Sequence, residues 1–376
     1  MKMTPGHASL PHPASDGGTP RLPQYPFFQM PVFARFTPAR RRPDIEALEQ
    51  RCVARLSGLL RDAFDRQEEL ATFLEHRTSL WSLLTYASAR ADRIELLCAW
   101  IDVLFSIDDV FAQAPPARIR QLGIHELPAV IDGRSPAADT AFTQAFRQLR
   151  DQTLPLAPER VWQRYARTLH EFLHACHAER GLVQNLAALD LPTYEKYRNS
   201  SIGECCFPLL EVGLGIDLSD RLQELSELRR LNMLVARHWI GVNDVFSYRK
   251  ELYGGDTMNE IQLALAENGG DLQAAVDRVA ATVHRVETEF DHLTTKLRAG
   301  LTGRDSGFLA YLDALEAMIA GNLEWSYLTA RYNGRGHSWN GLTNTTVILT
   351  PSRTLYLPHE HAPAPDTGDA PTPGQP

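Results

Sequence analysis

Proline is placed very unevenly along this chain of 376 residues, and its placement constrains what the chain can fold into. Of the 24 prolines, seven fall in residues 1–33 and seven in residues 351–376, which leaves ten for the long segment between them. Because proline lacks an amide donor and clashes inside a helix, a long segment that avoids it is free to be helical. We therefore expect a helical body between two proline-rich ends.

The composition is that of an ordinary globular protein, with 44% hydrophobic and 22% charged residues. A formal charge of −8 argues against nucleic-acid binding, because contacts to phosphate backbones need a basic face. No apolar run reaches the ~18 residues that span a bilayer, and the N-terminus lacks a signal segment. The five cysteines contain no CxxC pair and suggest neither a zinc ribbon nor a disulfide framework. We expect a cytoplasmic protein without stable membrane insertion.

Apolar residues follow helical spacing, at intervals of three and four positions, through nearly all of the body. This pattern predicts helices at about 44–64, 77–90, 93–111, 138–151, 158–184, 193–213, 219–251, 258–267, 271–299 and 305–332. The one strand signal is TTVILT at 345–350. Helices joined by short loops, without a repeat, predict an all-α domain at 26–350 between flexible tails at 1–25 and 351–376.

A polar stripe follows one face of a predicted helix at Asn243, Ser247 and Glu251. Each helical residue turns by about 100°, so positions four apart drift by only about 40° and stay on one face. Amide, hydroxyl and carboxylate oxygens are hard ligands that suit Mg²⁺. Lys250 lies next to them and can supply positive charge to an anion held by that metal. From spacing alone, a solvated polar helix face is an equal alternative.

A pair of aspartates, Asp108 and Asp109, stands at the end of a strongly apolar segment. Neighbouring carboxylates repel each other unless a cation or a basic partner neutralises them. The pair therefore indicates a nearby cation or basic side chain, but by itself it is a weak signal, because two adjacent aspartates also fit a simple helix end or loop.

These two motifs, in this order and 135 residues apart in a helical chain, resemble those of the class I terpene synthases of bacterial type. In that family a single helical bundle surrounds a central apolar cavity, and an aspartate-rich motif faces an Asn/Ser/Glu motif across the cavity mouth. The resemblance implies metal binding by Asp108, Asp109, Asn243, Ser247 and Glu251. The third acidic residue usual in the first motif is missing, so metal binding on that side rests on Asp108 with help from Asp109.

Other segments match the same family in order. Lys250 stands where the family places a diphosphate-binding lysine, and Arg198, which lies 45 residues before the Asn/Ser/Glu motif, is similar to its diphosphate-sensing arginine. Near the C-terminus, Arg331 and Tyr332 look like the family's closing Arg-Tyr pair. The resemblance implies that these four residues are catalytic. Taken singly, each arginine would more often be a surface or ion-paired residue.

The resemblance also implies an aromatic cavity wall, formed by Trp100, Phe105, Phe207 and Trp325, with Trp239 as a further candidate. Aromatic faces attract cations, and a cavity that excludes water lets a carbocation cyclise before it is quenched. The plain alternative is that these side chains belong to the core.

The implied activity is that of a terpene cyclase, which ionises a linear isoprenyl diphosphate and cyclises the carbocation. The family uses three Mg²⁺ ions, with Mn²⁺ as an alternative, and it allows a homodimer. Farnesyl diphosphate is the expected substrate. Geranylgeranyl diphosphate comes next, because Val103 stands where a bulkier aromatic residue is frequent. Chain elongation is not expected, because a prenyltransferase should carry two aspartate-rich motifs.

One motif competes with this interpretation. The segment HEFLH, from His170 to His174, fits the HExxH pattern in which two histidines bind Zn²⁺ and a glutamate acts as general base. The extended pattern is missing, because His177 and Arg180 stand where its glycine and third histidine would be. The segment is therefore better explained as a plain helix with two histidines about one turn apart. A zinc peptidase and a non-catalytic helical binding protein are kept as alternatives.

Overall fold

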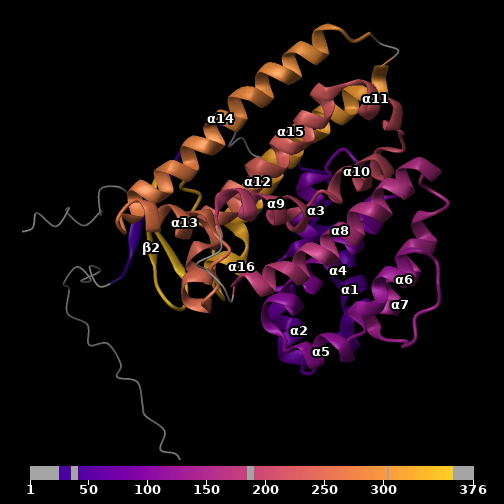
Figure 1. Cartoon of the computed structure of the whole chain (residues 1–376), viewed down its shortest axis with the longest axis horizontal. Helices are drawn as coiled ribbons and strands as arrows, with labels where there is room; N and C mark the ends of the chain where they lie inside the picture. The colour runs from indigo at the N-terminus through magenta and orange to yellow at the C-terminus, as the bar shows by residue number, and fades with distance from the viewer. Residues whose placement is uncertain (1–24, 35–40, 184–189, 303–304, 359–376) are drawn as a thin grey trace, which may run out of the picture.

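The apolar periodicity of the body becomes helix almost everywhere in the computed structural model, which describes residues 25–34, 41–183, 190–302 and 305–358 (Figure 1). In the first half the helices are α1 (Ile45–Leu60), α2 (Gln67–Leu74), α3 (Thr78–Thr85), α4 (Ile94–Gln113), α5 (Pro116–Gln121), α6 (Leu127–Ile131), α7 (Ala141–Thr153) and α8 (Glu159–Val183), with 3-10 turns η1 (Arg61–Ala63) and η2 (Ile124–Glu126). In the second half they are α9 (Leu191–Ile202), α10 (Cys206–Leu214), α11 (Ser219–Glu224), α12 (Ser226–Gly254), α13 (Glu260–Glu267), α14 (Leu272–Ala299), α15 (Ser306–Leu328) and α16 (Ala330–Asn333). The predicted all-α bundle is confirmed, and α2, α5 and α6 are additions to it.

The helices α4 and α12 carry the two predicted metal motifs and lie in the interior of the bundle. Helix α4 is apolar on nearly every face and packs against α1, α3, α7 and α8. Helix α12 is 29 residues long and packs against α9, α14, α15 and α16. None of the helices in the described part of the chain is both long and apolar enough to cross a membrane.

A glycine divides the predicted helix 193–213 into α9 and α10. Gly203 has a φ of +151°, which side chains rarely adopt, and a Cβ added there would lie 3.0 Å from a ring carbon of Trp239 and 3.1 Å from Cys206 Sγ. The break therefore depends on glycine at this position. The structure likewise divides the predicted helices 219–251, at Leu225, and 305–332, at Thr329.

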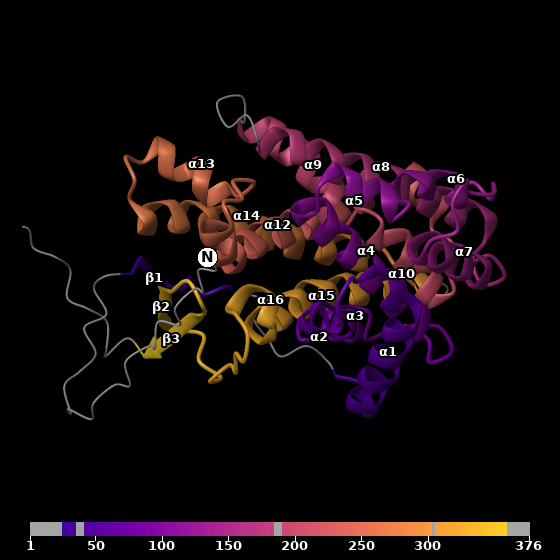
Figure 2. The ribbon, with the colours of Figure 1, turned by 90° about the horizontal axis from the view of Figure 1, so that it is seen from below.

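A three-stranded antiparallel sheet lies at the end of the bundle where α13 and α16 also lie (Figures 1 and 2). Its strands are β1 (Phe27–Gln29), β2 (Thr345–Leu349) and β3 (Thr354–Pro358), in the order β1-β2-β3. In the register, Val347 lies opposite both Phe28 and Tyr356.

The predicted strand at 345–350 is confirmed by β2, and the sheet continues past the predicted domain boundary at residue 350. The turn after β2 and the whole of β3 pair with the body through residue 358, so the start of the predicted C-terminal tail belongs to the fold. Proline marks the end of a helical region, but it is compatible with an edge strand. The predicted tails at 1–24 and 359–376 lie outside the described residues.

Candidate active site

A cavity of about 300 Å³ opens among α3, α4, α8, α9, α12 and α15. Both predicted motifs reach it, because Asp108 comes from α4 and Asn243 and Glu251 come from α12. Beside these polar groups lies an apolar, largely aromatic wall formed by Trp81, Leu104, Phe105, Phe172, Trp239 and Trp325. The chain therefore folds into the predicted arrangement of two polar motifs at an apolar cavity.

Arg331 bridges the aspartate pair on α4. One of its terminal nitrogens donates to Asp108 Oδ2 at 2.7 Å, and the other donates to Asp109 Oδ1 at 2.6 Å. The guanidinium carbon lies 5.3 Å from the ring centroid of Phe105. Burial raises the pKa of Asp109, but the charges of Arg331 and Lys250 outweigh this effect and hold that pKa below its ordinary value. Arg331 thus neutralises the two carboxylates that the sequence places side by side.

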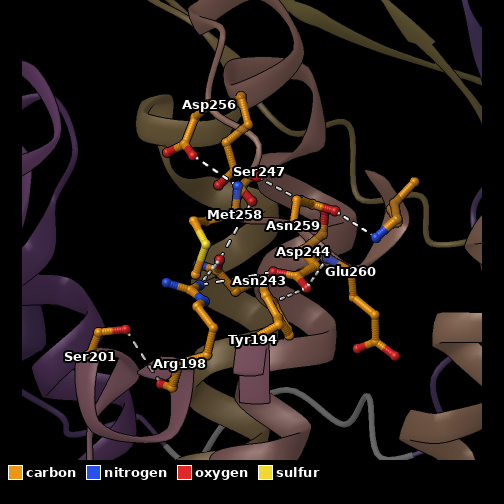
Figure 3. A network of polar contacts seen from close by, with 12 residues as sticks. Tyr194, Arg198, Ser201, Asn243, Asp244, Ser247, Asp256, Met258, Asn259 and Glu260 are labelled. Atoms are coloured by element: carbon orange, nitrogen blue, oxygen red, sulfur yellow. Dashed lines mark hydrogen bonds and ion pairs between the residues drawn. The ribbon is translucent and has the colours of Figure 1, made fainter. Parts of the chain in front are cut away.

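Asn243 joins three elements of the site, and Figure 3 shows it beside Arg198 and Ser247. Its Oδ1 accepts a hydrogen bond from Arg198 Nη2 at 2.9 Å, and Ser247 Oγ donates to the same oxygen at 3.5 Å. Its Nδ2 donates to Tyr332 Oη at 2.5 Å. Helices α9, α12 and α16 therefore bring the predicted diphosphate-binding Arg198 and Tyr332 onto the predicted metal motif.

Glu251 continues this stripe along α12. It is 7% exposed, and its Oε2 accepts a hydrogen bond from Asn259 Nδ2 at 2.6 Å. Burial, and then the charge of Asp256, raise the pKa of Glu251 above its ordinary value. Lys250 also lies in the cavity wall, whereas Ser247 is 1% exposed and lies beneath that wall. Asp109 is not a wall residue either.

Asp244, the second residue of the Asn-Asp motif, has a structural role. Its Oδ2 accepts hydrogen bonds from the Tyr194 hydroxyl and, at 2.8 Å, from the backbone amide of Glu260 (Figure 3). Burial raises the pKa of Asp244 to about 7. The residue fastens α9 and the start of α13 to α12, so it stands on a different side of the helix from the predicted ligands.

Two predicted wall residues, Trp100 and Phe207, do not line the cavity. Trp100 points away from it: its Nε1 donates to Thr153 Oγ1 at 2.9 Å, and its ring packs edge-on against Phe146 and Tyr165. Because α4 is apolar all round, its sequence pattern does not show which face meets the cavity.

Phe207 lies one layer behind the wall, where its ring stacks on Trp239 with a centroid distance of 5.9 Å. Phe105, Trp239 and Trp325 are in the wall, as expected. Val103 is fully buried outside the wall, so its small size does not enlarge the cavity in the way that favoured geranylgeranyl diphosphate.

Several wall residues were missed by the sequence analysis. Glu179 and Arg180 enter from α8, and Asp256 enters from the turn after α12. Ser201 Oγ donates to Glu179 at 2.5 Å, and burial raises the pKa of Glu179 to about 7. Nothing in the local sequence marks these residues.

Asn322 was also missed, although a local signal was present. It lies three positions before Trp325, on the same face of α15, so helical spacing could have placed it in the wall. Its Oδ1 accepts a hydrogen bond from Trp81 Nε1 at 2.9 Å, which joins α15 to α3.

The HEFLH segment lies on α8, and its side chains have ordinary partners. His170 Nε2 lies 2.9 Å from Asp132 Oδ1, and Arg167 pairs with Glu171 at 2.9 Å. Within the described ranges, no group of three or more His, Cys, Asp and Glu side chains is arranged to hold a metal ion. The zinc-peptidase alternative is therefore not favoured.

The donors present fit a hard divalent cation. Asn243 Oδ1 and Ser247 Oγ lie 3.5 Å apart, close enough to bind the same ion, and the buried carboxylate of Glu251 follows on the same helix. Asp108 supplies a further oxygen from α4. Such oxygen sets suit Mg²⁺, which keeps its remaining positions for waters or phosphate oxygens.

Comparisons with known proteins agree with this site. The sequence model of the family described as "Terpene synthase family 2, C-terminal metal binding" matches residues 99–289, half of the chain. The (3S,6E)-nerolidol synthase of Selaginella moellendorffii is 24% identical over 88% of this chain and 91% of its own. The (+)-T-muurolol synthase ((2E,6E)-farnesyl diphosphate cyclizing) of Roseiflexus castenholzii is 27% identical over 77% of this chain and 90% of its own.

Among solved structures, the linalool/nerolidol synthase of Streptomyces clavuligerus superposes with a TM-score of 0.68. It is 22% identical and covers 78% of this chain and all of its own, which shows a shared fold. Fold and site together define a helical lyase that acts on isoprenyl diphosphates. The chain belongs to the terpene synthase family, within its metal-binding family 2.

Proposed function

We propose that this terpene synthase is a Mg²⁺-dependent cyclase of farnesyl diphosphate. The observation that carries the proposal is the meeting of the Asp108 and Asn243 motifs with Arg198 and Arg331 at an aromatic cavity. The cavity, at about 300 Å³, is at the small end of the range for ligand sites, about 300–1,000 Å³. Its size, and the substrate named for the similar T-muurolol synthase, favour a C15 over a C20 chain.

The cationic side chains bind and orient the diphosphate. Arg198, Lys250 and Arg331 line the cavity from α9, α12 and α16, and Tyr332 lines it as well. Ionisation moves negative charge onto the departing diphosphate, so fixed donors stabilise the transition state more than the ground state. Bound Mg²⁺, for which we propose a cluster of three ions with Mn²⁺ as an alternative, supplies further neutralisation of this charge.

The aromatic wall then protects the allylic cation. Trp81, Phe105, Trp239 and Trp325 present ring faces or edges to the cavity, and electron-rich faces attract a cation. Their bulk excludes water, which would otherwise quench the cation before cyclisation. Cys176 also lines the cavity, but burial raises the pKa of its thiol well above the ordinary value. It therefore stays a neutral thiol and a weak nucleophile.

The experiment that tests this function is incubation of the purified protein with Mg²⁺ and, separately, C10, C15 and C20 isoprenyl diphosphates. We expect cyclic C15 hydrocarbons or alcohols from farnesyl diphosphate in gas chromatography with mass detection. Removal of divalent ions with EDTA should abolish turnover, and added Mg²⁺ should restore it. If none of the three diphosphates gave a product, the proposed cyclase activity would be wrong. If only the C20 substrate were turned over, the proposed C15 substrate would be wrong.

A further inference from the structure

The two predicted diphosphate ligands Arg331 and Tyr332 lie on α16, a helix of only four residues. So short a helix is not stable by itself, because helix nucleation is unfavourable. The position of these two side chains above α12 must therefore be set by contacts from other parts of the molecule.

The first of these contacts comes from Arg249, which is on α12 beside the metal motif. Its Nε donates to the backbone carbonyl of Tyr332 at 3.1 Å, and its Nη1 donates to the carbonyls of Thr350 at 3.5 Å and Pro351 at 3.0 Å. Arg249 is 7% exposed. A buried cation is costly unless its donors are bonded, so these three carbonyls are specific partners of this guanidinium.

The second contact comes from β3. Tyr356 Oη donates to Asn333 Oδ1 at 2.6 Å, and Asn333 is the residue that follows Tyr332. Asn333 Nδ2 in turn donates to the carbonyls of Ser326 and Thr329, each at 2.9 Å. The side chain of Asn333 therefore joins the end of α15 to β3 and fixes the C-terminal residue of α16.

The third contact is between backbone segments, where the chain after α16 lies against the turn between β2 and β3. Gly334, directly after α16, has a φ of +93°, and a Cβ added there would lie 2.3 Å from the carbonyl oxygen of Ser352. The turn between β2 and β3 thus lies against the chain that leaves α16, with no room for a side chain. Tyr253 Oη, on α12, also donates to the carbonyl of Leu349 at 2.8 Å.

We propose that residues 345–358, the terminal hairpin, together with Arg249, hold Arg331 and Tyr332 in place, and that Arg249 is a positioning residue for diphosphate ionisation. Arg249 fixes the Tyr332 backbone to the same helix that presents Asn243, and the 2.5 Å hydrogen bond between Asn243 and Tyr332 depends on this spacing. The inference rests on the proposed function, because its effect falls on diphosphate binding and on closure of the cavity.

The test compares Arg249→Met and Arg249→Lys with Arg230→Met. Arg230 is on the same helix but is about half exposed and pairs with Glu289, so it serves as the matched control. We expect Arg249→Met to raise the KM for farnesyl diphosphate about tenfold or more, the scale of a lost charge-assisted hydrogen bond. The fraction of uncyclised alcohols should also rise, because an imperfectly closed site admits water.

Arg249→Lys should recover part of both effects, and Arg230→Met should change neither. A folded Arg249→Met protein with unchanged KM and product ratio would overturn the inference. Should that variant fail to fold, Tyr356→Phe decides, because it removes one hydroxyl from the same arrangement. An unchanged KM and product ratio in Tyr356→Phe would then count against the proposal.

Calorimetric binding of inorganic diphosphate with Mg²⁺ separates the two proposals. A wild-type protein that binds diphosphate but turns over no isoprenyl substrate would contradict the proposed function alone. In that case weaker diphosphate binding by Arg249→Met, but not by Arg230→Met, would still support the positioning role, and equal binding would overturn it.

Discussion

Arg331 faces two carboxylates with one guanidinium, and its side chain is only 5% exposed. A planar fork can bridge two acceptors in a way that a single ammonium cannot reproduce. We expect Arg331→Lys to lower kcat/KM for farnesyl diphosphate by about a hundredfold or more, while the protein stays folded. Arg335→Lys is the control, because Arg335 is exposed and pairs with Glu75. Steady-state kinetics check this, and equal kcat/KM values in the two variants would contradict it.

Glu251 is the one carboxylate in the α12 stripe. Glu251→Gln keeps the shape of the side chain but removes the charge that a divalent cation requires. We expect the Mg²⁺ concentration for half-maximal activity to rise by about tenfold or more. Glu267→Gln, at an exposed position that pairs with Arg278, should leave it unchanged. A Mg²⁺ titration of activity measures the difference, and identical titrations would argue against Glu251 as a metal ligand.

At the scale of elements, the break between α9 and α10 depends on Gly203. Its φ of +151° is strained for any other residue, and the Trp239 ring at 3.0 Å would have to shift to admit a Cβ. Gly203→Ala should lower the free energy of unfolding by about 1–3 kcal/mol and change the products, because Trp239 lines the cavity.

Gly58, inside α1, is the matched control. A Cβ added there meets nothing within 4 Å, so Gly58→Ala should stabilise the protein by about 0.5–1 kcal/mol. Denaturant unfolding and product profiles check both changes. A Gly203→Ala protein as stable as the wild type would show that the break between α9 and α10 does not require glycine.

Asp102 fastens α4 to the start of α3, since both Thr78 Oγ1 and Ser79 Oγ donate to its carboxylate at 2.6 Å. Burial raises the pKa of Asp102 from 3.8 to about 7. The folded protein therefore keeps a proton that the unfolded chain releases over this range. Protonation of Asp102 therefore stabilises the folded state fully below about pH 4, and this contribution to the free energy of unfolding is lost as the pH rises to about 7.

Asp102→Asn removes this group from titration. As the pH rises from 4 to 7, the unfolding midpoint of the wild type should therefore fall steadily relative to that of Asp102→Asn. Asp151→Asn, at an exposed position, should follow the wild-type curve. Thermal unfolding at several pH values tests this, and parallel curves for wild type and Asp102→Asn would contradict it.

At the scale of the whole molecule, the terminal hairpin extends the folded unit to Pro358. Proline positions alone suggest that residues 352–376 are dispensable, but β3 lies within that range. We expect a chain that ends at Pro358 to keep wild-type kinetics, and a chain that ends at Pro351 to lose most activity. Kinetic assays with circular dichroism measure both. Full activity in the shorter chain would show that β3 is dispensable. The homodimer and the cytoplasmic location stay predictions.

Short-range pattern accounts for what the sequence by itself determined. Helical spacing predicted the bundle, because periodicity needs only local information. The resemblance to the class I terpene synthases, carried by the motifs at Asp108, Asn243 and Arg331, implied which polar side chains meet at the cavity.

Only the tertiary structure decided the remainder. Trp100 and Phe105 lie on the same apolar helix, and packing against α7 and α8 turned Trp100 away from the cavity. Glu179 lines the cavity from α8, where no sequence motif indicates this position. Arg249 donates hydrogen bonds to the carbonyl oxygens of Thr350 and Pro351, about a hundred residues further along the chain. Such contacts depend on how distant elements pack in three dimensions, which no local pattern in the chain encodes.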